Sequence, residues 1–224
     1  VEKGVADAWG VTFGQFDEDE AMEVAVGTKE GWVAIFDGET QEMQWKKDMD
    51  NNDGADSLCY SLIAADLDGD DIDELIVPQQ NKMTIFIDGE KDNFVEDSSV
   101  KSGYGLANEN LFGNSNEELI VADGNGKIRI MGLSGSSLTT YQEWNTGYPM
   151  NTGAGITVST NNADDPWLIH GSDSGVVMAW EITSQTEHDE VWSTNSESNE
   201  NSIYSIEGGG AYGITAGDID DDGV

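Results

Sequence analysis

Four apolar segments of similar sequence recur along this 224-residue chain at nearly constant spacing. They are Glu23-Val-Ala-Val-Gly27, Glu74-Leu-Ile-Val-Pro78, Glu118-Leu-Ile-Val-Ala122 and Trp167-Leu-Ile-His-Gly171. Their last residues stand 51, 44 and 49 positions apart. Short apolar runs bounded by polar turns are typical of buried β-strands, and a period of about 40 to 50 residues is typical of propeller blades. The repeat therefore restricts the chain to a series of similar β units.

Each segment lies among three other short strands. An opening strand such as Trp9 to Phe13 precedes it, a strand such as Trp32 to Phe36 follows it, and an aromatic residue closes each unit. The closing aromatics are Trp45, Phe94, Trp144 and Trp192. Four strands per unit predict an all-β protein, a β-propeller of four-stranded antiparallel blades. We expect one domain, 1–224, with blades at about 5–50, 57–98, 101–147 and 152–195 and the first strand of a fifth blade in 203–224.

An acidic loop leads into the second of these segments. Its carboxylates stand at positions 1, 3, 5 and 9: Asp66, Asp68, Asp70 and Glu74. Alternate carboxylates on one turn supply the oxygen ligands that Ca²⁺ prefers, so we expect a calcium site. The loop is not an EF-hand, because that motif needs Gly at position 6 and Glu at position 12, where this chain has Asp71 and Val77.

Copies of the loop occur in the other units. The last copy has Asp218, Asp220 and Asp222 at positions 1, 3 and 5, and the sequence ends soon afterwards, so we expect a fragment of a seven- or eight-bladed propeller. The first has Gln15 at position 1, with Asp17, Asp19 and Glu23 as ligands of a weaker site. In the third copy Phe112 replaces a ligand, and the stretch from Ser159 to Trp167 has lost the pattern, so we expect no ion in that fourth unit.

These loops and strands resemble FG-GAP repeats, also called VCBS repeats, of integrin-α-type propellers. The family pattern Asp-x-Asp-x-Asp-Gly-x-x-Asp/Glu-Leu-x-Val is matched almost fully by residues 66–77. A looser resemblance to quinoprotein-like blades rests on Glu39 to Trp45, where Gln41 replaces the usual Gly. The FG-GAP resemblance implies a calcium-stabilised, extracellular or cell-surface module that acts in adhesion, ligand binding or scaffolding. Its expected partner is a protein, a glycan or another subunit of an extracellular assembly.

The composition excludes some classes of function. Acidic residues outnumber basic ones by 45 to 9, giving a formal net charge of −36. Such a surface repels nucleic acid and anionic membranes, so we expect no nucleic-acid partner. This excess of acidic residues is also expected of a protein from a halophilic or marine organism. No apolar run approaches the roughly 20 residues of a membrane helix, and Cys59 is the only cysteine, so we expect neither membrane insertion nor an internal disulfide.

The search for catalytic groups favours a protein that is not an enzyme. The two histidines, His170 and His188, have no zinc-ligand spacing, and His170 ends an apolar segment, which favours a core role. Sites that stabilise developing negative charge need basic groups, and this chain has one arginine, Arg129. Two alternatives stay open: a propeller domain of a secreted enzyme, similar to polysaccharide lyases or quinoproteins, and a purely architectural repeat that pairs through an open strand edge.

Overall fold

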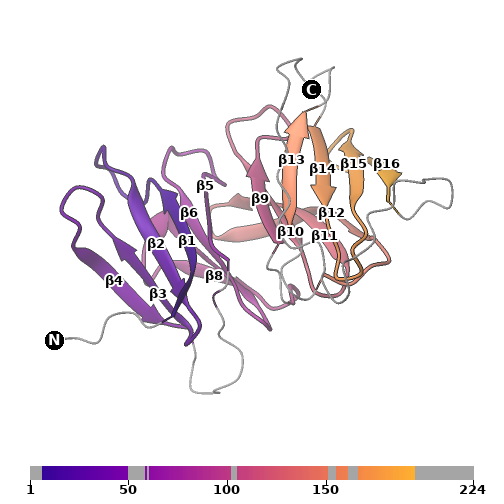
Figure 1. Ribbon diagram of the computed structural model, residues 1–224. Helices are drawn as coiled ribbons and strands as arrows, with labels where there is room; N and C mark the ends of the chain where they lie inside the picture. The colour runs from indigo at the N-terminus through magenta and orange to yellow at the C-terminus, as the bar shows by residue number, and fades with distance from the viewer. Residues whose placement is uncertain are drawn as a thin grey trace, which may run out of the picture. The chain divides into compact units, whose positions relative to one another are not determined.

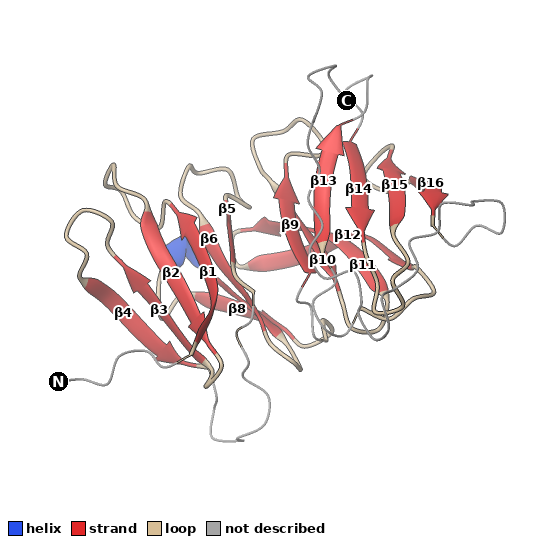
Figure 2. Cartoon of the chain, viewed as in Figure 1, coloured by secondary structure: helices blue, strands red, loops and turns tan. Residues whose placement is uncertain are grey.

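The computed structural model describes residues 7–49, 59, 61–101, 105–150, 155–160 and 166–194. Within them the chain folds into β-strands, with one short 3-10 turn, η1 (Ile87–Gly89) (Figure 2). The strands form four separate antiparallel sheets, each of four strands (Figure 1). The predicted all-β class with four-stranded blades is confirmed. Among the described residues, no helix is long and apolar enough to span a membrane.

Each sheet is a meander whose strands pair in sequence order. The first sheet contains β1 (Ala8–Gly14), β2 (Glu23–Thr28), β3 (Trp32–Phe36) and β4 (Met43–Asp48). The second contains β5 (Ile63–Ala65), β6 (Glu74–Pro78), β7 (Met83–Phe86) and β8 (Phe94–Asp97). The third contains β9 (Gly105–Glu109), β10 (Glu118–Ala122), β11 (Lys127–Ser134) and β12 (Ser137–Asn145). The fourth contains β13 (Ile156–Thr160), β14 (Pro166–His170), β15 (Met178–Ile182) and β16 (His188–Ser193).

Burial differs between the strands of a blade. All five residues of β6 and all five of β10 are buried, whereas β4, β8 and β16 have no fully buried residue. A strand covered on both faces reads as a continuous apolar run, and a strand with one solvated face carries more polar residues. The repeated apolar segments of the sequence are therefore the second, inner strands of the blades.

The chain divides into two compact units. The first contains 1–103, 115–117 and 132–139, and the second contains 104–114, 118–131 and 140–224. Within each unit the opening strands of two successive blades lie side by side, β1 with β5 and β9 with β13. The first unit has a core that includes Ile35, Leu75 and Phe86, and the second has one that includes Ile120 and Trp180.

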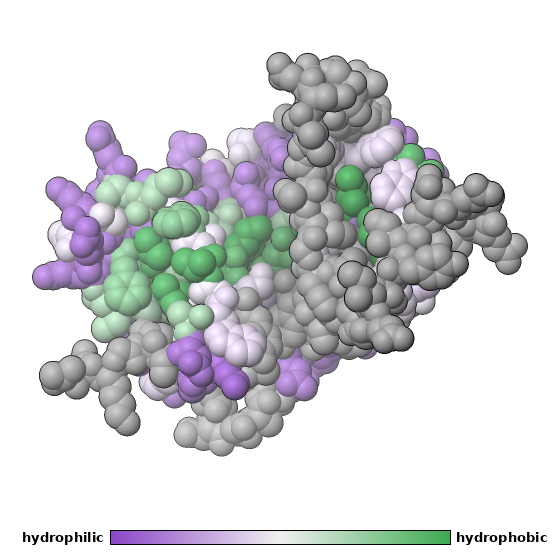
Figure 3. Space-filling view, in the orientation of Figure 1, coloured by the Kyte–Doolittle hydropathy of each residue, from purple (hydrophilic) through white to green (hydrophobic). Residues whose placement is uncertain are grey.

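One face of β1 exposes large apolar side chains. Trp9, Val11 and Phe13 alternate along the strand and are 52%, 61% and 65% exposed. Apolar surface gathers over this part of the first unit in Figure 3. Alternate residues of a strand point to the same side of the sheet, so these three side chains form one apolar strip.

Several strand boundaries differ from the sequence prediction, among them those of two third strands. The third strand of the second blade ends at Phe86, because the next residues enter the turn η1, where Asp88 has a φ of 50°. In the fourth blade the third strand begins at Met178 rather than at Val176. The predicted fifth-blade strand and the residues Asp218, Asp220 and Asp222 lie outside the described residues.

Candidate metal centre

The loops between the first and second strands of the first three blades share one internal hydrogen bond. At the ninth position of each loop a buried glutamate begins the second strand, and its Oε2 accepts a hydrogen bond from the backbone N–H of the second loop residue. The pairs are Glu23 with Phe16 at 2.7 Å, Glu74 with Leu67 at 2.7 Å, and Glu118 with Leu111 at 2.9 Å. This hydrogen bond joins the start of the loop to the start of the second strand without the help of a bound ion.

A second repeated contact joins the loop of the second blade to that of the first, and the loop of the third blade to that of the second. The backbone N–H of Asp73, at position 8 of its loop, donates to the carbonyl of Gln15 at 2.7 Å, and Asp73 Oδ2 accepts from the Gln15 N–H at 2.8 Å. Glu117 pairs in the same way with the backbone of Asp66, at 2.9 and 3.2 Å. The acids at position 8 therefore act as links between loops, a role that the sequence analysis missed.

In the second blade, Asp66 organises the loop through its own backbone. Its Oδ1 accepts hydrogen bonds from the N–H groups of Gly69 and Asp70 at 2.7 and 3.2 Å, and its Oδ2 accepts from Asp71 at 3.1 Å. Gly69 and Asp71 both have positive φ, 83° and 72°, which Gly and Asp tolerate best. Asp66 thus caps the turn in the manner of an Asx motif.

The carboxylates of the second blade form two overlapping groups. Asp66, Asp68 and Asp70 each offer an oxygen within 4.8 Å of the others, as the loop pattern predicted. Asp68, Glu74 and Asp88 do the same, and we call these three residues the inner cluster. Asp88 comes from η1, between β7 and β8, and the sequence analysis did not identify it. The structure therefore brings the carboxylates of the predicted site together in two groups and adds the carboxylate of Asp88 from a second turn.

Each residue of the inner cluster has a buried oxygen with no hydrogen-bond partner in the described part of the chain. These atoms are Asp68 Oδ1, Glu74 Oε1 and Asp88 Oδ1. A buried carboxylate oxygen with no partner is costly, and buried charges in proteins are normally paired or bound to metal. The donor set is all oxygen and anionic, which suits a hard divalent cation. The residues present therefore fit a bound cation of this type.

The electrostatics of the inner cluster agree with its burial. Burial, with the charges of Asp68 and Asp88 in the same direction, raises the pKa of Glu74 to about 8, although the backbone amides of Leu67 and Asp88 lower it. Burial and the charges of Asp70 and Asp66 raise the pKa of Asp68. Burial and the charges of Asp70 and Asp68 raise the pKa of Asp88. No positively charged group of the described residues lowers the pKa of these three carboxylates, and a bound cation would have that effect.

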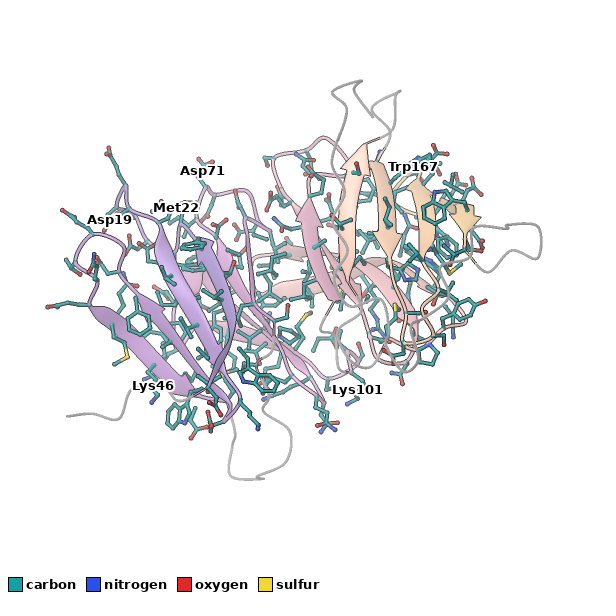
Figure 4. The ribbon with its side chains drawn as sticks, in the orientation of Figure 1. Asp19, Met22, Lys46, Asp71, Lys101 and Trp167 are labelled. Atoms are coloured by element: carbon teal, nitrogen blue, oxygen red, sulfur yellow. The ribbon has the colours of Figure 1, made fainter. Side chains whose placement is uncertain are left out.

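The first-blade loop also brings three carboxylates together, but the side-chain amide of Gln15 binds part of the loop backbone. Asp17, Asp19 and Glu23 offer oxygens within 4.8 Å of one another, and Glu23 Oε1 is buried without a partner. Gln15 Nε2, at position 1, donates to the backbone carbonyls of Asp17 and Asp19. Figure 4 shows that Asp19 and Asp71 extend from the same edge of the first unit, at which both loops lie.

The third-blade loop is closed without carboxylates at positions 1, 3 and 5. Asn110 Nδ2 donates to the backbone carbonyl of Asn114, and Phe112 packs edge-on against Tyr141 with ring centroids 6.1 Å apart. No cluster of three metal-ligating residues occurs there among the described residues. In the fourth blade, residues 161–165 of the corresponding stretch lie outside the described part of the chain.

The arginine, the cysteine and the two histidines are each buried or in contact with a partner. Arg129 forms ion pairs with Asp123 and Glu143, Cys59 is buried, and burial raises the pKa of its thiol to about 12. His170 is fully buried, with Nδ1 3.0 Å from the carbonyl of Gly171, as expected for a core histidine. His188 Nδ1 lies 2.8 Å from Gln142 Oε1, and its ring stacks on Trp144.

Comparisons with known proteins bear on the fold. No protein-family model matches the chain, and no curated protein matches it. Two similar solved structures are crystal structures of BBS1N in complex with ARL6DN, one soaked with mercury and one with lead. They align with TM-scores of 0.55 and 0.56, each at 11% identity over 82% of this chain. The chain spans about half of theirs, 52% and 55%, and the likeness, together with the four-stranded sheets, identifies its fold as a β-propeller.

Proposed function

We propose that the chain is a calcium-stabilised β-propeller module of the FG-GAP type that binds a partner and catalyses no reaction. The observation that carries the proposal is the set of buried, unpartnered oxygens on Asp68 and Glu74, at two positions where the loop pattern predicts ligands. A divalent cation there neutralises carboxylates that otherwise repel one another across a single turn. The ion is structural in this proposal, because it fixes the connection between β5 and β6.

The number of carboxylates favours Ca²⁺ over Mg²⁺. Ca²⁺ takes about 6–8 oxygen ligands in a flexible geometry, whereas Mg²⁺ usually keeps several waters and is bound through one or two carboxylates. Each carboxylate group of the second blade has three acidic residues. Zn²⁺ is disfavoured because its usual sites contain Cys or His, and neither occurs in these groups.

The binding role rests on the apolar strip of β1 and on the turns at the strand ends opposite the calcium loops. The apolar strip Trp9, Val11 and Phe13 is the kind of exposed patch that marks a protein contact. Turns at the opposite strand ends, such as Thr28 to Gly31 and Asp123 to Gly126, offer further recognition surface. The similar structures are titled as complexes with a protein, ARL6DN. A protein partner, in adhesion or in scaffolding of an extracellular assembly, is therefore our first choice over a glycan.

An extracellular or cell-surface location completes the proposal. Extracellular fluids hold enough calcium to fill sites of modest affinity, in the range of about 10⁻⁴–10⁻³ M for extracellular modules. The net charge of −36 also agrees with a salt-rich environment in which repulsion between surface carboxylates is screened. An enzymatic role has no comparable support, since the one arginine is held by Asp123 and Glu143.

Calcium titration calorimetry tests the proposal. The chain is titrated at high salt, which suppresses loose attraction to the acidic surface. We expect a saturable site that is lost in the double variant Asp68→Ala, Asp70→Ala. Circular dichroism of the variant shows whether its β structure is intact, so that loss of binding is separated from loss of folding. The absence of saturable binding to the unaltered chain contradicts the proposal.

A further inference from the structure

We propose that Asp88, on the turn between β7 and β8, is a ligand of the second-blade cation, which is held by the inner cluster rather than centred on Asp66, Asp68 and Asp70. This inference rests on the proposed function, because it assigns the position and the ligands of the same ion. It makes the ion a clamp between two turns that are 14 residues or more apart in the sequence.

The free oxygens favour the inner position. Glu74 is fully buried, and its Oε1 has no partner, while Oε2 is used by the Leu67 amide. Asp68 Oδ1 and Asp88 Oδ1 are also buried without partners, and the cluster offers three oxygens within 4.8 Å of one another. A cation at this point satisfies three buried acceptors at once.

Asp66 is poorly available in comparison. Its two carboxylate oxygens accept three backbone N–H groups, two on Oδ1 and one on Oδ2. An oxygen that already accepts two hydrogen bonds has used both of its lone pairs, so only Oδ2 of Asp66 retains capacity for an ion. Asp66, the first residue of the pattern, therefore serves mainly to hold the loop backbone in place and contributes less to binding the ion.

The turn that carries Asp88 is fixed in place by its own contacts. The N–H of Ile87 donates to the Asn93 carbonyl at 2.9 Å, and Trp45 Nε1 donates to the Gly89 carbonyl at 2.9 Å. A Cβ on Gly89 would lie 2.5 Å from Phe16 Cβ, so only glycine fits there. Asp88 itself has a φ of 50°, an unfavourable conformation for most L-residues. The carboxylate is thus presented to the cluster by a rigid turn.

The topology explains why these two turns meet. In a four-stranded meander, the connection from the first to the second strand and the connection from the third to the fourth strand lie at the same end of the strands. A cation held by both connections links all four strands of the blade at that end. The first blade has the same Asp-Gly-Glu sequence at Asp37, but there Asp37 Oδ1 accepts from Thr40 N–H at 2.6 Å, and Asp37 is in no carboxylate cluster.

The variant Asp88→Asn tests the assignment, with Asp71→Asn as its matched control. Both positions lie in the second blade, both have positive φ, which Asn tolerates, and both lose one negative charge, but Asp71 belongs to neither cluster. Calorimetry at high salt should show calcium affinity at least about tenfold lower for Asp88→Asn and within about twofold for Asp71→Asn, because affinity depends on the charge of the ligands. Equal affinities of the two variants overturn the assignment and leave the proposed calcium site standing.

Hydrogen exchange supplies a second readout. Calcium binding to the unaltered chain should slow amide exchange at Ile87 and Glu90 of the distant turn as well as in the loop, because the ion restrains both. The equivalent turn in the first blade, through Asp37 and Gln41, should not change at calcium concentrations that just fill the second blade. Protection confined to the loop contradicts the clamp. If the unaltered chain binds no calcium at all, both this inference and the proposed function fail.

Discussion

The loops of the second and third blades share one backbone hydrogen bond but differ in the side chains that line their interior. In both, a buried ninth-position glutamate accepts a hydrogen bond from the amide of the second loop residue. In the second blade the interior of the loop is lined by carboxylates with unpartnered oxygens, whereas in the third blade the Asn110 amide donates across the loop. The difference is that the third-blade loop supplies its own N–H donor, whereas the carboxylates of the second-blade loop leave a role that, in our proposal, a bound cation fills.

The largest effect is expected from the ninth-position glutamates. Glu74→Gln keeps an acceptor for the Leu67 amide but removes the buried charge, so calcium should no longer stabilise the chain. A ligand at 100 to 1,000 times its dissociation constant stabilises by about 2.7–4.1 kcal/mol, which the variant should lose. Denaturant unfolding with calcium and with EDTA measures this. Glu118→Gln, at the same position of the third blade, is the control and should keep the full calcium effect.

A smaller gain is expected in the first blade. Gln15→Asp replaces the amide that holds the carbonyls of Asp17 and Asp19 with the residue type found at position 1 of the second blade. The variant should bind calcium at this loop about tenfold more tightly, a change of about 1.4 kcal/mol. Calorimetry would detect it as a strengthened second phase. An unchanged second phase would mean that the residue at position 1 does not decide between amide and ion.

The third blade should show the converse. Asn110→Asp removes the N–H that donates to the Asn114 carbonyl, and Phe112 offers no replacement ligand. We expect a loss of about 1 kcal/mol in the free energy of unfolding, the usual net worth of one hydrogen bond. Calcium should not restore it. Restoration by calcium would show that this loop can still take an ion, and the comparison would fail.

The smallest effect concerns pH in the fourth blade. Burial lowers the pKa of His170, so the folded state favours the neutral ring and the unfolded chain binds the proton more readily. Stability linked to this group is present above the unfolded pKa of about 6.5 and is lost as pH falls from there toward the folded pKa. An NMR titration of the ring should give a pKa below 6.5, and His170→Gln should remove this part of the pH dependence.

Most of the fold follows from the sequence because its period is carried by buried strands. The second strands β6 and β10 have the predicted bounds, since a continuous apolar run is buried on both faces. The grouping of Asp66, Asp68 and Asp70 was also predictable, because these carboxylates are close in sequence and their spacing is set by one turn. Local patterns with a local cause were therefore recovered.

The missed residues act across turns or across blades. Asp88 lies near Glu74 because, in a meander, the connection between the third and fourth strands lies at the same end of the sheet as the connection between the first and second strands. Asp73 binds the backbone of Gln15, which carries no sequence preference that could identify a partner. One usable pattern was present: Asp-Gly-Glu recurs at Asp37 and Asp88 with the spacing of 51 residues that also separates the first two apolar segments.

The melting temperature of the unaltered chain, measured at high salt in excess calcium and in excess EDTA, tests the central claim most directly. The account predicts a higher melting temperature with calcium, because the ion satisfies the buried oxygens of Asp68, Glu74 and Asp88. The double variant Asp68→Ala, Asp70→Ala should show no such difference. Equal melting temperatures of the unaltered chain in the two solutions would contradict a structural cation in the second blade.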